Sequence, residues 1–152
     1  MQLIAEAHCD IPCGIYDPTP AKLAAKTIQR MVEQLQAFHL PETWDDETAV
    51  HHYVASVSRR VTIKEQQAET CKRELQILWS DFFKPEHLKE FPDLHATVWQ
   101  ALKLCSTNKQ ELNHQAALDL VQAIDTIAEH FYAIKGAPER YTAYQEVTDH
   151  LF

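Results

Sequence analysis

The sequence of 152 residues has only two glycines and little β-branched alternation, which argues against a β-rich fold. It also lacks a hydrophobic run of the roughly 20 residues needed to cross a bilayer. The first residues, MQLIAEA, carry no positive charge before a short apolar stretch, which is not the pattern of a secretory signal. We therefore expect a helical, cytoplasmic protein with no membrane partner.

Positive charge is scarce as well. The 14 basic and 22 acidic residues give a net charge of −8, and no stripe of Lys and Arg stands out, so nucleic acid is not an expected partner. Net charge acts at long range, so it does not exclude a small anionic substrate at a local basic patch. Of four cysteines, Cys71 and Cys105 stand alone in helical patterns and are expected to be buried, inert thiols.

Apolar residues recur at spacings of three and four, which predicts four amphipathic helices and an all-α, antiparallel four-helix bundle. Thr19 and Pro20 resemble a helix start, Thr43 or Asp45 could cap the second helix, and Gly136 followed by Pro138 resembles a helix stop. STNK is expected to break the third helix, and the tail to Phe152 has room for another short one. The expected helices run from Thr19 to Phe38, Val50 to Phe82, Pro92 to Cys105 and Lys109 to Lys135.

The second expected helix is long enough, at roughly 50 Å, to accommodate a kink or a break. Its apolar stripe is interrupted by Lys64. Such a lysine usually extends its ammonium group to the surface, and less often reaches a cleft between subunits or in an active site.

The most unusual segment is AHCDIPCGIYDP, residues 7–18. Imidazole and thiolate donors suit late transition metals, Pro12 would stiffen the turn between the cysteines, and Gly14 would let the chain reverse. A Cys-x-x-x-Cys spacing alone is a weak signal, because no second cysteine pair completes a zinc site. The spacing by itself leaves metal binding and other uses of the thiols open.

The segment HCDIPCGIYDP resembles the nickel hook of nickel-containing superoxide dismutases, which reads H-C-D-x-P-C-G-x-Y-D-P. Three further stretches are similar to that family in the same order along the chain, and the family's four-helix bundle agrees with the helical pattern. These stretches are TIKEQQAE at 62–69, LWSDFFKP at 78–85 and FPDLH at 91–95.

The resemblance implies three parts: a leader, residues 1–7, removed by a maturation peptidase; a nickel hook, residues 8–18; and a single bundle domain, residues 19–152. It implies that nickel binds the α-amine of His8, the amide nitrogen and thiolate of Cys9 and the thiolate of Cys13, with the His8 imidazole axial in the oxidised state. Square-planar nitrogen and sulfur donors favour Ni(II). In the uncut chain the His8 nitrogen is an amide, so we expect no assembled site there.

The resemblance further implies Ni(III)/Ni(II) cycling that converts superoxide to O2 and H2O2. Tyr16 would control access to the metal and Asp10 would support the hook, while Lys64 and Lys84 could attract the anion. The family also implies a homohexamer. Ala24 and Gln67 stand where the family carries a glutamate and an arginine that orient the imidazole, and Phe82 replaces a tyrosine, which puts imidazole positioning and proton delivery in question.

Other functions remain open on the residues alone: a non-catalytic nickel or copper module, or a thiol switch through a Cys9–Cys13 disulfide. A ferritin-like di-iron site needs two Glu-x-x-His motifs, and only Glu111 to His114 fits. Surface or capping roles are expected for the histidines at 51, 52, 87, 95, 130 and 150, and packing or interface roles for Trp44, Trp79, Trp99, Tyr141 and Tyr144.

Overall fold

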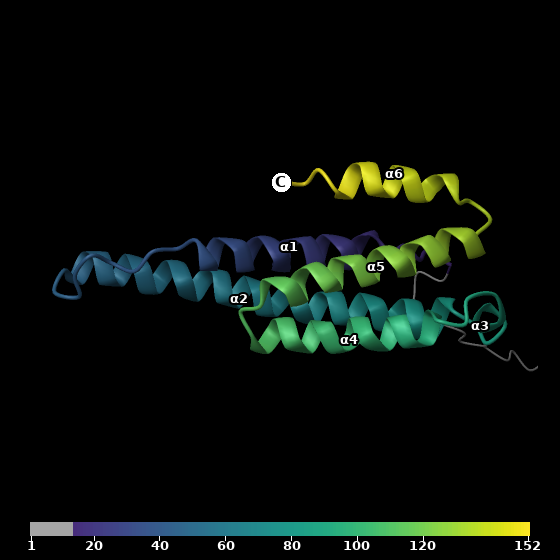
Figure 1. The fold of residues 1–152 in the computed structure, drawn as a ribbon, viewed down its shortest axis with the longest axis horizontal. Coiled ribbons are helices and arrows are strands. Elements are labelled where there is room, and N and C mark those ends of the chain that lie inside the picture. The colour runs from purple at the N-terminus through teal and green to yellow at the C-terminus, as the bar shows by residue number, and fades with distance from the viewer. Residues whose placement is uncertain (1–13) are drawn as a thin grey trace, which may run out of the picture.

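The computed structural model describes residues 14–152, which form six α-helices and one π-helix and contain no strand. In Figure 1, α1, α2, α4 and α5 lie along one long axis with alternating directions, which confirms the predicted antiparallel four-helix bundle. No helix in this range is long and apolar enough to span a membrane. The elements are α1 (Thr19–Gln36), α2 (Glu47–Ile77), η1 (Leu78–Phe82), α3 (His87–Glu90), α4 (Leu94–Gln110), α5 (His114–Ile134) and α6 (Glu139–Thr148).

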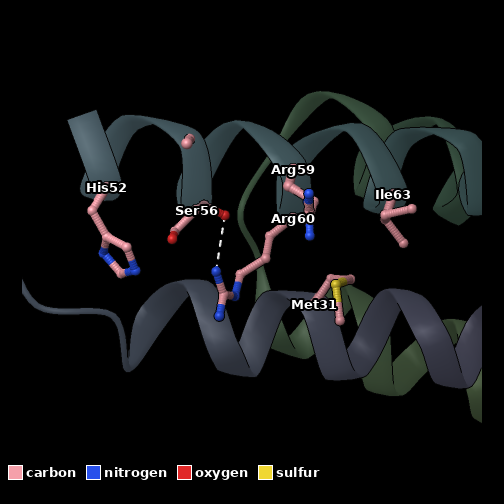
Figure 2. Close-up of a pocket in the computed structure, with 7 residues that line it drawn as sticks. Met31, His52, Ser56, Arg59, Arg60 and Ile63 are labelled. Atoms are coloured by element: carbon pink, nitrogen blue, oxygen red, sulfur yellow. Dashed lines mark hydrogen bonds between the residues drawn. The ribbon is translucent and has the colours of Figure 1, made fainter.

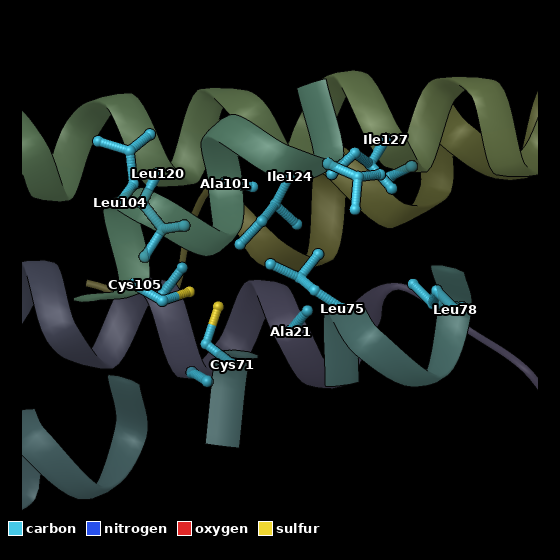
Figure 3. Close-up of a cluster of buried hydrophobic side chains, with 14 of the residues drawn as sticks. Ala21, Cys71, Leu75, Leu78, Ala101, Leu104, Cys105, Leu120, Ile124 and Ile127 are labelled. Atoms are coloured by element: carbon cyan, nitrogen blue, oxygen red, sulfur yellow. The ribbon is translucent and has the colours of Figure 1, made fainter. Parts of the chain in front are cut away.

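The core fills the space between the four long helices with mostly aliphatic side chains from all four, and Figure 3 shows a part of it that includes Ala21 of α1, Leu75 of α2, Ala101 of α4 and Ile124 of α5. Cys71 and Cys105 are both free and buried there, as predicted. A hydrogen bond with Cys105, together with burial, raises the pKa of the Cys71 thiol well above its usual value. The thiolate is therefore disfavoured, which agrees with the expected lack of reactivity.

The long second helix differs from its prediction at both ends. Its buried positions begin only at Lys64, and Val54, expected on the inner face, is 55% exposed, because the α1–α2 hairpin extends beyond α4 and α5 in Figure 1. At the other end the helix passes into the π-helix η1, where the N–H of Phe83 donates to the carbonyl of Leu78 at 2.9 Å. The length of the helix predicted room for a kink or a break, and the change in helical geometry that the structure describes is this π turn, through which the helix continues.

The predicted break at STNK is wrong, because α4 continues through these residues to Gln110 and α5 begins only at His114. The buried Asn108 explains the difference. Its side-chain NH2 group donates to the carbonyls of Leu104 and Ala116, both at 2.9 Å, so the two donors of this buried residue are satisfied inside the helix pair. Asn113 caps α5 by accepting from the N–H of Ala116 at 3.0 Å.

Two predicted helix starts also need correction. The carboxylate of Asp17, and not the side chain of Thr19, accepts a hydrogen bond at the start of α1. Asp46, and not Thr43 or Asp45, caps α2 by accepting from the N–H groups of Thr48 and Ala49. The helix stop at Gly136 is confirmed by its left-handed φ of +67°, and the tail adds the helix α6 as expected.

Candidate functional site at the hook exit

Most of the predicted hook lies outside the described residues. This applies to the predicted nickel ligands His8, Cys9 and Cys13 and to Asp10, which was predicted to support the hook. The structure does describe Gly14–Pro18, the segment that joins the hook to α1 and that we call the hook exit. Gly14 has a φ of +81°, and no atom lies within 4 Å of the place that a Cβ would occupy, so backbone conformation alone favours glycine here. This left-handed residue agrees with the predicted chain reversal.

Asp17 fastens the hook exit to the bundle. One carboxylate oxygen accepts from the N–H of Thr19 at 2.8 Å, and the other accepts from the hydroxyl of Tyr132 on α5 at 3.1 Å. Burial, followed by the charge of Asp17, raises the pKa of Tyr132, so its hydroxyl stays protonated and donates. The last turns of α5 thereby set where the hook enters the fold. No sequence pattern pointed to this pair, because its members lie 115 residues apart.

Tyr16, which was predicted to control access to the metal, is half-buried against an aromatic surface. Its ring centroid lies 6.0 Å from that of Phe82 in η1, and Phe82 lies 4.4 Å from Phe131 in α5. The π turn thus places Phe82, where the sequence resemblance implied a tyrosine in the family, directly beside Tyr16. The structure brings these two predicted residues together.

A positive charge accompanies this aromatic surface. The ammonium group of Lys135 lies 5.4 Å from the ring centre of Phe82 and 5.8 Å from that of Phe131. Lys84 follows Phe83 at the end of η1 and is exposed. The sequence predicted Lys84 as a charge that could attract an anion, and it did not predict Lys135. The position of Lys135 in the last turn before the Gly136 helix stop could have drawn attention to it.

Lys64 does not extend its ammonium group to the surface. It is 4% exposed, and its ammonium group donates to the carbonyls of Asn108, Lys109 and Glu111 at the end of α4. Burial lowers its pKa. This cap lies beside the start of α5, whereas Tyr132 lies near the other end of that helix. Within one chain, Lys64 is thus not an attracting charge at the hook exit.

Ala24 and Gln67, the other two positions at which the resemblance implied a departure from the family, are not equivalent in the structure. Ala24 is 2% exposed and belongs to the core face of α1, whereas Gln67 is half-buried on α2. An alanine methyl group cannot hydrogen-bond to an imidazole, so the first of these positions contributes packing alone.

The remaining histidines divide between confirmed and corrected expectations. The expected surface position is confirmed for the exposed histidines at 51, 52, 95 and 150. His87 makes a local contact at the start of α3, where its Nδ1 accepts from the N–H of Lys84 at 3.0 Å. The expected surface or capping role is wrong at His130, which is 9% exposed and lies on the ring of Phe91, with 4.4 Å between centroids. Glu111 lies in the α4–α5 connection, so Glu111 and His114 do not share a helix face. Within residues 14–152 no group of three His, Cys, Asp or Glu could hold a metal ion.

A groove of about 580 Å³ lies between α1 and α2, and Figure 2 shows the side chains that line it. Arg60 is already engaged there, because one guanidinium nitrogen donates to the Ser56 carbonyl at 2.9 Å and another to the Gln34 side chain at 3.2 Å. The groove lies on the α1–α2 hairpin, away from the start of α1. No described contact connects it with the hook exit.

Comparison with known proteins decides the family. A sequence model described as nickel-containing superoxide dismutase matches residues 3–135. The chain belongs to this family. The chain is 40% identical over 124 residues to a superoxide dismutase [Ni] of Streptomyces seoulensis, covering 80% of this chain and 85% of that protein. For the corresponding protein of Streptomyces coelicolor the identity is 36% over 129 residues, covering 83% and 88%.

The fold agrees with solved structures of the same family. A native nickel superoxide dismutase superposes with a TM-score of 0.70 at 34% identity, covering 86% of this chain and all of that one. An apo structure gives a TM-score of 0.68 at 31% identity, covering 82% and 100%. The predicted family, all-α bundle and nickel cofactor are thereby confirmed. The family match ends at residue 135, before α6 begins at Glu139.

Proposed function

We propose that the chain, once residues 1–7 are removed, disproportionates superoxide to O2 and H2O2 at a nickel ion held by His8, Cys9 and Cys13. Nickel-dependent superoxide dismutation is the activity of the family to which the chain belongs. The single observation that carries the assignment to this chain is its family match, which includes the segment with these donors. A non-catalytic nickel or copper module is not favoured by that match.

The donor set fits nickel. Two thiolates, an amide nitrogen and an amine from His8, Cys9 and Cys13 would form an anionic set of nitrogen and sulfur donors of the kind that suits nickel. When bound, nickel supplies the one-electron redox chemistry. The free amine exists only after cleavage between Ala7 and His8, which is why we include removal of residues 1–7 by a peptidase. The implied division is a leader (1–7), a hook (8–18) and a bundle (19–152).

The described residues support specific roles around the metal. We assign Tyr16 to control of access, because its ring lies at the hook exit against Phe82. Asp10 would support the hook by hydrogen bonds. Lys135 and Lys84 would raise the local concentration of an anionic substrate on a chain whose net charge is −8. Asp17 holds the hook exit to α5.

We further propose a cytoplasmic homohexamer in which a neighbouring subunit braces each hook. The hook has few apolar residues of its own, so external contacts would offset the entropy lost on ordering it. The end of the α1–α2 hairpin is not covered by α4 and α5, and Leu40 and Trp44 are exposed there. These apolar side chains are available for contacts between subunits. Light scattering of the trimmed protein with and without nickel measures the assembly.

The function is tested on protein cut after Ala7 and loaded with Ni(II). We expect rapid superoxide decay by stopped flow and, after oxidation, a rhombic Ni(III) EPR spectrum with splitting from an axial nitrogen. The Cys9→Ser variant, treated in the same way, is expected to lose both. Nickel binding without superoxide decay would favour the non-catalytic module, and metal-independent activity would favour the thiol switch.

A further inference from the structure

The helix α6 is held against the bundle by an ion-pair network around Lys22 in α1. The side chain of Lys22 is 0% exposed, and its ammonium group contacts both carboxylate oxygens of Asp125 in α5, at 2.5 and 2.7 Å. A third contact, at 3.1 Å, reaches Asp149 at the end of α6. The buried charge thus has partners on two other helices.

Tyr144 closes the same network from α6. Its hydroxyl donates to Asp125 at 3.0 Å, and the ammonium group of Lys22 lies 5.6 Å from its ring centre. Burial, followed by the charge of Asp125, raises the pKa of Tyr144, so this hydroxyl stays protonated and donates. We call the four residues Lys22, Asp125, Tyr144 and Asp149 the α6 clasp.

The α6 clasp lies next to the hook exit by two routes. The first is α1 itself, because the N–H of Lys22 donates to the carbonyl of Pro18 at 3.1 Å. The second is Tyr132, whose ring centroid lies 6.0 Å from that of Tyr144 and whose hydroxyl donates to Asp17. Arg140 of α6 also lies over the Tyr132 ring, at 5.6 Å.

We propose that α6, through the α6 clasp and Tyr132, positions the hook exit. The position of the hook exit in turn sets the direction in which the chain would present its metal ligands. Tyr132 and Tyr144 are positioning residues in this scheme. The part concerning metal ligands rests on the proposed function, whereas the part concerning residues 14–18 does not. Because the family match ends at residue 135, this positioning device goes beyond what the family pattern supplies.

The first experiment measures hydrogen exchange by NMR in the full chain. The N–H of Thr19 donates to Asp17, so its exchange reports directly on the hook exit. Removing one net hydrogen bond through Tyr132→Phe should accelerate this exchange about fivefold, and Tyr144→Phe should accelerate it by a smaller factor. The amide of Glu111 at the end of α4, bonded to the Thr107 carbonyl, should exchange as in the parent chain.

Tyr141→Phe is the matched control. Tyr141 also belongs to α6, but its hydroxyl accepts from Gln145 of the same helix, whereas the hydroxyls of Tyr132 and Tyr144 each reach another element. It should leave the exchange of Thr19 unchanged. An exchange rate in Tyr144→Phe equal to that of the parent would overturn the proposal, even if Tyr132→Phe accelerates exchange, because Tyr132 belongs to α5. An acceleration by Tyr141→Phe equal to that of Tyr144→Phe would overturn it as well. Deleting residues 138–152 should accelerate the exchange of Thr19 more strongly. If the truncated chain does not fold, the test rests on the variants that remove a single hydroxyl group.

The second experiment uses the trimmed, nickel-loaded chain. We expect Tyr132→Phe to release Ni(II) to a chelator several-fold faster and to broaden the axial nitrogen splitting in the Ni(III) EPR spectrum, with Tyr141→Phe unchanged. Identical release and identical spectra would overturn the link to the metal ligands. If the trimmed parent itself does not bind nickel, the proposed function fails, while the exchange of Thr19 still decides whether α6 positions the hook exit.

Discussion

Two lysines are buried within residues 14–152, and the chain satisfies them in different ways, one against the middle of α5 and the other just before its start. Lys22 is surrounded by the carboxylates of Asp125 and Asp149, whereas Lys64 is surrounded by backbone carbonyls at the end of α4. The first arrangement joins three helices through charge. The second closes a helix end by satisfying carbonyls that α4 leaves without N–H partners.

The difference indicates how each region should respond to change. A carboxylate partner neutralises the buried ammonium group, so its loss leaves a charge unpaired. A carbonyl partner only solvates the ammonium group, so loss of the lysine leaves neutral acceptors unsatisfied, at a lower cost. Burial correspondingly lowers the pKa of Lys64.

The largest expected effect comes from breaking the carboxylate arrangement. Asp125→Asn should lower the free energy of unfolding by about 3 kcal/mol, because Lys22 would keep only the half-exposed Asp149 as a charged partner. Urea unfolding followed by circular dichroism measures this.

The matched control for Asp125→Asn is Asp119→Asn, an exposed position on the same helix, which should change stability by less than about 0.5 kcal/mol. Adding Lys22→Met to Asp125→Asn should restore part of the loss, since no unpaired charge remains. A double variant less stable than Asp125→Asn would contradict the account of Lys22.

A smaller effect is expected at the carbonyl arrangement. Lys64→Met should lower the free energy of unfolding by about 2 kcal/mol, because three carbonyls at the end of α4 lose their shared donor. Lys109→Met is the control nearby: its ion pair with Glu69 is exposed and screened by solvent, so its loss should destabilise the fold less than the loss of Lys64. If the two variants were equally stable, Lys64 would not be a helix cap.

Alkaline pH should weaken the Lys22 end. Burial, followed by the charge of Asp125, raises the pKa of Tyr141 to about 12, and the pKa of Tyr144 is raised as well. The folded chain then keeps protons that the unfolded chain releases near pH 10, so the free energy of unfolding should fall as pH rises from about 10 towards 12. Urea unfolding at pH 8, 10 and 11 measures the slope. Tyr144→Phe should reduce that slope, and an unchanged slope would contradict the assignment.

The sequence singled out only one of these two lysines, and it did not predict the buried position of either. Lys64 is conspicuous because it interrupts an apolar stripe, yet its acceptors belong to a helix end whose position was predicted wrongly. Lys22 has no such signal, since its partners Asp125 and Asp149 lie 103 and 127 positions away. Periodicity reports which face of a helix is buried, but it carries no information on which polar groups meet across helices.

The bundle itself was predictable because its helices are long and their apolar spacing is regular. Boundaries were less predictable: Asn108 resembled a helix breaker and is a buried, fully helical residue with two carbonyl partners. At the hook, the motif identified the family, whereas the fastening of Asp17 to Tyr132 required the fold. Local chemistry was thus predictable, and its attachment to the bundle was not.

The smallest expected effect concerns Phe82, which belongs to the same end of the bundle as Lys22. Phe82→Tyr adds a hydroxyl to a half-buried ring beside Tyr16 and should change the free energy of unfolding by less than about 0.5 kcal/mol. A phenol, with an ordinary pKa near 10, adds a proton donor there. The fall in the rate of superoxide decay at alkaline pH should therefore begin at slightly higher pH. Stopped-flow rates from pH 7 to 10 measure this, with Phe91→Tyr, which packs on His130 instead, as the control. An identical profile in Phe82→Tyr and the parent would mean that Phe82 serves only as a surface on which Tyr16 packs.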